Sequence, residues 1–138
     1  MGGNMQPEGV LLDLYDLQVT GDASPQAGSA TEVEVKFKFS QPFYGTFVQP
    51  KSWPYTVKVY AEGYGGSWDW TEGSPQERSW TKNGTCTQSS EDFAVKVPVT
   101  LNREGVYKLS AIVELDAQAG WVMGYSEKEV QISVWTAV

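Results

Sequence analysis

The amino-acid sequence predicts an all-β fold, an antiparallel sandwich of two sheets with seven or eight strands and essentially no helix. Hydrophobic and polar residues alternate with a period of two along most of the chain, and no window has the period of an amphipathic helix. Runs rich in Gly, Ser, Pro and Asp separate the alternating segments, as the loops of a sandwich do. The 138 residues, 41% of them hydrophobic, are enough to bury one core. We therefore expect a single domain over residues 1–138, with residues 1–9 as a flexible N-terminus.

The first expected strand, residues 10–20, contains a change of phase. Leu12 and Leu14 share one parity, whereas Leu17 has the other, so all three can face the core only if the alternation is interrupted. A β-bulge near Tyr15 would explain the interruption. A strand that crosses from one sheet to the other would also explain it.

Four further segments alternate cleanly between apolar and polar residues. Clean alternation indicates that one face of a strand is buried and the other is solvated, as in an antiparallel sandwich. A shorter strand is expected near residues 77–82. The four alternating segments are residues 32–39, 54–62, 92–101 and 128–136.

The strand expected at residues 106–115 follows a distinctive corner. Gly105, Tyr107, Leu109 and Ala111 occupy alternate positions at its start. This pattern resembles the tyrosine corner of immunoglobulin-like sandwiches. The resemblance implies that the hydroxyl of Tyr107 bonds to the backbone of the preceding turn.

The same resemblance identifies this strand as strand F and thereby labels the others. Pro98 cannot donate a hydrogen bond to a ladder, which favours an edge position for strand E. An edge position favours the fibronectin III type of arrangement, with sheets A-B-E and C′-C-F-G, over the antibody constant type. The strands are then A (10–20), B (32–39), C (54–62), C′ (77–82), E (92–101), F (106–115) and G (128–136).

In this arrangement the loops divide between the two ends of the sandwich. The B–C loop (40–53), the C′–E loop (83–91) and the F–G loop (116–127) lie at one end. The A–B loop (21–31), the C–C′ loop (63–76) and the E–F corner lie at the other.

Aromatic residues are concentrated in two loops of the first end. Function in sandwiches is often carried by loops at one end, so these rings predict a contact surface for a protein or a glycan. The alternative is that the long loops fold over the open end of the core and fill it with these rings. The candidate ligand-binding residues here are Tyr44, Trp53, Trp121 and Tyr125, accompanied by Phe43, Phe47 and Met123.

The C–C′ loop has the strongest shift of composition in the chain. Trp68 and Trp70 would share one side of a locally extended segment, with Asp69 between them. Two such rings beside carboxylates are similar to the sugar platforms of carbohydrate-binding modules on sandwich folds. The alternative is an extra hairpin whose Trp pair packs on the sheet.

The composition argues against an enzyme, and we expect no catalytic residue, cofactor or metal. The chain has no His, which excludes Ser-His-Asp and Cys-His pairs. Cys86 is the only cysteine, so no intrachain disulfide is possible, and no activating base is evident beside it. Asp69 and Glu72 could form the carboxylate pair of a glycosidase, but a small sandwich offers little cleft for a substrate. Because no spaced Asp-x-Asp loop appears, the acidic residues fit a solvated surface better than a calcium site.

The formal charge of −7 and the pI near 4.5 argue against nucleic acid or an anionic membrane surface as partner. No apolar run is long enough to insert into a membrane. The lone cysteine and an N-terminus without a signal-like segment favour the cytoplasm. Secretion is the alternative if the sequence is a piece of a longer protein.

Together these observations predict a non-catalytic binding module that recognises a protein partner through aromatic loops at one end of the sandwich. We expect a monomer or a weak homodimer. A carbohydrate-binding module that recognises an oligosaccharide through Trp68 and Trp70 is the first alternative. A structural spacer domain of a larger assembly is the second.

Overall fold

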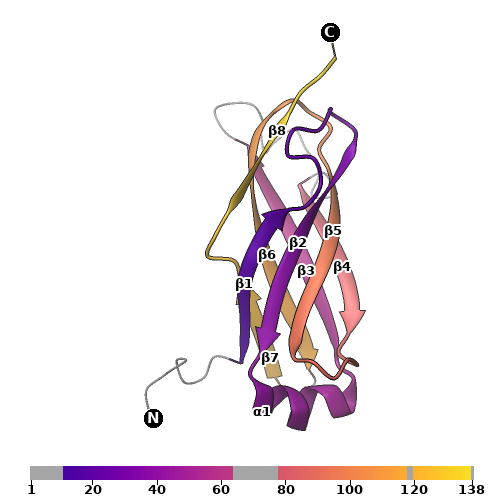
Figure 1. Ribbon diagram of the computed structural model, residues 1–138, viewed down its shortest axis with the longest axis vertical. Coiled ribbons are helices and arrows are strands. Elements are labelled where there is room, and N and C mark those ends of the chain that lie inside the picture. Colours follow the sequence, from indigo (N-terminus) through magenta and orange to yellow (C-terminus); the bar gives the residue numbers. More distant parts are fainter. Residues whose placement is uncertain (1–10, 64–77, 118–119, 138) are drawn as a thin grey trace.

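Two antiparallel sheets face each other in the computed structural model, which describes residues 11–63, 78–117 and 120–137 (Figure 1). The expected flexible N-terminus and nearly all of the C–C′ loop lie outside these residues. Within them, the strands number eight, inside the predicted range of seven or eight. The elements are β1 (Leu12–Val19), β2 (Ala30–Phe39), α1 (Gln41–Phe43), η1 (Tyr44–Val48), η2 (Gln49–Lys51), β3 (Pro54–Gly63), β4 (Ser79–Thr85), β5 (Asp92–Thr100), β6 (Gly105–Ala117), β7 (Gly120–Tyr125) and β8 (Val130–Val134).

The strand order confirms the predicted fibronectin III type of arrangement. One sheet has the order β1-β2-β5, which corresponds to A-B-E. The other has the order β4-β3-β6-β7, with β8 also paired to β6, which corresponds to C′-C-F-G. Pro98 lies in β5, at the edge of the smaller sheet. No described strand pairs with the outer side of β5, so the missing N–H of Pro98 breaks no hydrogen bond of a ladder there.

The phase change in the first strand is a β-bulge, as one of the two explanations proposed. Leu14 pairs with Phe37 and Asp16 pairs with Lys36, so Tyr15 is the extra residue. β1 stays paired with β2 on both sides of the bulge, which excludes a change of sheet. The bulge lets Leu17 point into the core although its parity differs from that of Leu14.

Strand G differs from the prediction, because it is divided into β7 and β8. β7 pairs with residues 112–117 of β6 and β8 pairs with residues 105–109. Between them, Ser126 continues the ladder: its N–H donates to the Ala111 carbonyl at 2.9 Å, and its hydroxyl accepts from the Ala111 N–H at 2.9 Å. The sequence predicted a loop over 116–127 because Gly124 stands at a buried position where an apolar side chain would have revealed the alternation.

The B–C segment also differs from the prediction, because it is helical. α1, η1 and η2 follow one another without a break, and they lie across one end of the sandwich (Figure 1). The Tyr44 N–H donates to the Ser40 carbonyl at 2.9 Å, and Tyr44 and Val48 place their side chains in the core one turn apart. The segment is short and contains Gly45 and Pro50, which weakened its helical signal. None of the helices in the described ranges is long and apolar enough to span a membrane.

Aromatic rings from both sheets form the part of the core that lies next to the helical segment. Phe37 of β2 stacks on Phe93 of β5 with centroids 5.1 Å apart, and the edge of Tyr55, from β3 in the opposite sheet, meets Phe37 at 5.4 Å. Phe39 contacts Phe37 at 6.0 Å. Edge-to-face and offset contacts of this kind add to the stabilisation that burial of the rings provides.

The tyrosine corner has the predicted hydrogen bond. Tyr107 is fully buried, and its hydroxyl donates to the Arg103 carbonyl at 2.8 Å. Burial also raises the pKa of the Tyr107 phenol, so the hydroxyl remains a donor at neutral pH. The bond fastens the turn between β5 and β6 to the start of β6.

Replacing Tyr107 with Phe should lower the free energy of unfolding by about 1–3 kcal/mol, because it leaves the Arg103 carbonyl without this partner. Urea unfolding would measure the loss. Tyr125→Phe is the matched control, since the Tyr125 side chain is exposed and its loss should stay within about 0.5 kcal/mol. Equal urea midpoints for Tyr107→Phe and the wild type would show that Tyr107 serves only as a core ring.

Candidate functional site

The helical segment and the connection between β4 and β5 form the end of the sandwich where aromatic residues were predicted to gather. Two backbone hydrogen bonds join this connection to the strands and loops beside it. The Cys86 N–H donates to the Trp53 carbonyl at 2.9 Å, and the Phe39 N–H donates to the Glu91 carbonyl at 3.1 Å. This end is therefore a closed cap on the core.

Tyr44 lies inside this cap. Its side chain is only 2% exposed and stacks on Phe39 with centroids 5.4 Å apart. Its hydroxyl donates to the Gln88 carbonyl at 2.6 Å, and burial raises its pKa to about 12. Tyr44 thus fills the open end of the core, as the alternative interpretation proposed, and it offers no surface to a ligand.

The other rings of the segment are divided between core and solvent. Trp53 and Phe43 are half-buried and pack against the core. Phe47 lies beside Phe43, with centroids 6.2 Å apart, and is 57% exposed. Phe47 is therefore the most accessible ring of the helical segment.

The aromatic residues predicted for the F–G loop lie on a strand instead. In β7, Tyr125 pairs with Ile112 of β6, Met123 pairs with Glu114, and Trp121 pairs with Asp116. Tyr125 is 66% exposed and Met123 is 38% exposed.

Two residues of the neighbouring strands extend this apolar surface. The register places Lys58 of β3 beside Ile112, and Ile112 beside Tyr125, while Tyr60 lies two residues further along β3 on the same face. Tyr60 is exposed and Ile112 is partly exposed. We call Tyr60, Ile112, Met123 and Tyr125 the outer aromatic face. The sequence analysis missed Tyr60 and Ile112, although both stand at solvent-facing positions where an apolar residue is a signal.

Two charges at the centre of this face are paired with each other. The Lys58 ammonium lies 3.4 Å from the Glu114 carboxylate, next to Ile112 and Met123 in the register. Nearby, the Thr56 hydroxyl donates to Asn83 at 2.9 Å. The ion pair at the centre of the outer aromatic face thus leaves it without net charge.

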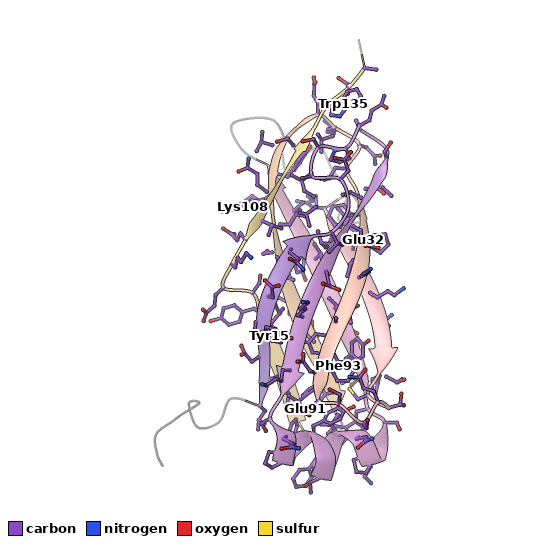
Figure 2. The ribbon with its side chains drawn as sticks, viewed as in Figure 1. Tyr15, Glu32, Glu91, Phe93, Lys108 and Trp135 are labelled. Carbon is purple, nitrogen blue, oxygen red and sulfur yellow. The ribbon has the colours of Figure 1, made fainter. Side chains whose placement is uncertain are left out.

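The outer face of the smaller sheet has the opposite character. It is dominated by charged residues, including Glu32, Glu34, Lys36 and Lys96. Tyr15 also lies on this sheet (Figure 2), but its hydroxyl donates to the Asp92 carboxylate at 2.6 Å. This hydrogen bond, with burial and the nearby carboxylates, raises the pKa of Tyr15 to about 12. Such a ladder of charges is typical of a solvated face.

The described residues offer little for catalysis or metal binding. Cys86 is fully buried, and burial raises its pKa to about 11, so the thiol stays protonated at neutral pH. In the described ranges, no three Cys, Asp or Glu side chains gather as metal ligands would. Trp68, Trp70, Asp69 and Glu72 lie outside the described residues, so the carbohydrate site and the glycosidase pair stay predictions.

The fold and the tyrosine corner define the class of the protein as an immunoglobulin-like β-sandwich. Solved structures that are similar to it include the CARDB domain of the PF1109 protein from Pyrococcus furiosus, crystallised with di-metal ions (16% identity, TM-score 0.47, covering 95% of this chain and 100% of that one). The PapD-like domain 7 of human CEP192 is another (13% identity, TM-score 0.43, 99% and 92%). A third is AggA, the major subunit of aggregative adherence fimbriae type I from Escherichia coli (12% identity, TM-score 0.37, 89% and 95%).

These similarities are distant, and they carry no argument about what this chain binds. No protein-family model matches the chain, and no curated protein matches it either.

Proposed function

We propose that this chain is a non-catalytic binding module that recognises a protein partner through the outer aromatic face. One observation carries the proposal: the exposed side chains of Met123 and Tyr125 lie beside Ile112 on a face whose central charges are paired with each other. The proposed partner is a protein, as in the hypothesis from the sequence. The proposed contact surface is on the larger sheet and not in the loops.

The chemistry of this face fits a protein interface better than a solvated surface. Interface cores are enriched in aromatic residues and Met and depleted of charged residues. Tyr60, Met123 and Tyr125 are of these enriched types, and the two charges beside them neutralise each other, whereas the outer face of the smaller sheet is dominated by charged residues.

The strands also hold these side chains in place before a partner arrives. Tyr125 and Met123 lie on a strand that is paired to β6, so their backbone is already ordered. Binding then costs less conformational entropy than it would for residues on a flexible loop.

Replacing Tyr125 or Met123 with Ala should abolish partner capture while leaving the melting temperature nearly unchanged. Exposed residues contribute little to the core, whereas hot-spot residues of an interface cost about 2–4 kcal/mol of binding when truncated. Affinity capture from the native host with wild-type and variant proteins would measure the effect, with thermal unfolding of each variant alongside.

Tyr15→Ala is the matched control, because Tyr15 is an exposed tyrosine on the opposite sheet. It should retain the proteins that the wild type retains. If Tyr125→Ala, Met123→Ala and Tyr15→Ala all retain the same proteins, the outer aromatic face is not the contact surface. The structural-spacer interpretation would then be the better one.

A further inference from the structure

The outer edge of β4 is a sheet edge that lies apart from the outer aromatic face. β4 is the last strand of the larger sheet, at the edge of the molecule (Figure 1). Its ladder with β3 runs from Pro54 and Thr85 to Tyr60 and Ser79 without a register shift. No strand of the described part pairs with its other side. An edge strand of this kind presents a row of backbone donors and acceptors that another extended chain can use.

The edges of the smaller sheet are protected. On β5, Pro98 removes a backbone donor from the edge. On β1, the bulge at Tyr15 interrupts the ladder, and β7 lies very close: a Cβ added to Gly124 would be 3.3 Å from the Leu12 carbonyl oxygen. Bulges and covering segments are devices that prevent edge-to-edge association.

At the other edge of the larger sheet, β8 is covered, because the chain before β2 runs along it. The Ser133 N–H donates to the Ala23 carbonyl at 3.0 Å, and the Ala27 N–H donates to the Trp135 carbonyl at 2.7 Å. β4 has no proline, no bulge and no described segment bonded along it. β7 shares these features, but its Gly124 lies against the backbone of β1.

The side chains of β4 restrict what can pair with it. Lys82 stands at its centre, is exposed, and pairs with Val57, so it lies on the core side of the sheet. β4 contains no acidic residue, although the chain as a whole carries a charge of −7. An inward-facing charge at an edge opposes an apolar strand. A second copy paired antiparallel about Lys82 would place two ammonium groups side by side, which is unfavourable.

We propose that the edge of β4 binds an extended acidic segment of a partner protein by strand addition, with a carboxylate opposite Lys82. The backbone of the segment would pair with β4 and extend the larger sheet, as in other cases of β-augmentation. Small apolar residues would lie opposite Gly84 and Trp80, which flank Lys82 on the same face, and hydroxyl residues would lie opposite Thr81 and Asn83.

A synthetic peptide with this pattern tests the proposal. The probe is acetyl-Thr-Val-Thr-Glu-Thr-Val-Thr-amide, added to the full chain at up to millimolar concentration. Changes in the backbone amide shifts of the protein would report where it binds. We expect them along β4, together with slower amide hydrogen exchange at its outward N–H groups. A probe with Lys in place of Glu should bind about threefold to fivefold more weakly, in keeping with the strength of cross-strand ion pairs.

Lys82→Glu should reverse this preference, so that the Lys peptide binds better than the Glu peptide. Tyr125→Ala is the control variant and should bind both peptides as the wild type does, which separates this proposal from the function of the outer aromatic face. A Glu peptide N-methylated at alternate residues keeps its charge but cannot form the ladder, and it should not bind.

Three outcomes would overturn the proposal. The first is the absence of shift changes along β4 with the Glu peptide. The second is equal binding of the N-methylated peptide, which would indicate charge attraction alone. The third is protection of the β4 amides in a dimer formed without peptide, which would identify a second copy as the occupant.

Discussion

Replacing Phe37 with Ala should lower the free energy of unfolding by about 3–5 kcal/mol, one of the two largest effects that we expect from a truncation. Phe37 is fully buried and contacts Phe93 in its own sheet and Tyr55 in the opposite sheet. Its removal forfeits the transfer free energy of the ring and leaves a cavity between two sheets whose backbone ladders resist collapse. Urea unfolding followed by fluorescence would measure the loss.

Phe47→Ala is the control for this prediction, because Phe47 is largely exposed. It should cost less than about 1 kcal/mol, as surface substitutions usually do. Similar losses for the two variants would mean that the ring cluster around Phe37 is not the centre of the core.

Replacing Tyr44 with Ala should cost about 3–5 kcal/mol, because its ring closes the core beneath the helical segment. Tyr44→Phe should cost about 1–2 kcal/mol, since it keeps the ring but leaves the Gln88 carbonyl without its donor. Denaturant unfolding of both variants separates the contribution of the ring from that of the hydroxyl.

This pair of variants also decides between the two interpretations of the aromatic end. If Tyr44 were a contact residue, Tyr44→Ala would preserve stability and remove partner binding. Tyr125→Ala, by contrast, should preserve stability and remove partner binding. The same experiments on two tyrosines should therefore give opposite results.

Most of the fold could be predicted from the sequence because its signals are local. Alternation in β2 and β5 places Val33, Val35 and Phe37 on one buried face without knowledge of their partners. The phase change in β1 is also visible in the residue order, although a bulge was only one of two explanations for it, and the corner at Tyr107 was expected from its resemblance to immunoglobulin-like sandwiches. Strand order then follows from Pro98 and from the resemblance of the corner.

The missed features depend on contacts that the sequence order does not reveal. The helical segment is stabilised by Tyr44 and Val48 in the core, and these contacts outweigh a weak intrinsic propensity. β7 was hidden because Gly124 contributes no side chain to the alternation, and its place is instead taken by the backbone of β1 near Leu12.

The candidate site could be predicted only in part, for the same reason. Tyr125 was identified as a site residue, but its place on a strand was not. Tyr44 was grouped with it because a loop sequence does not show which rings turn inward. Tyr60 and Ile112 come next to Tyr125 only through the pairing of three strands, which depends on the tertiary register.

The division of strand G into β7 and β8 at Ser126 affects how these two strands can open. It divides the last ladder into two short pieces, each held to one half of β6. Short pieces at a sheet edge open more readily than long central strands, and they can open separately. Opening of β7 alone would withdraw Met123 and Tyr125 from the outer aromatic face while β8 stays in place. A partner bound to that face would then stabilise β7 against opening, so its affinity and the local stability of this one strand are thermodynamically coupled.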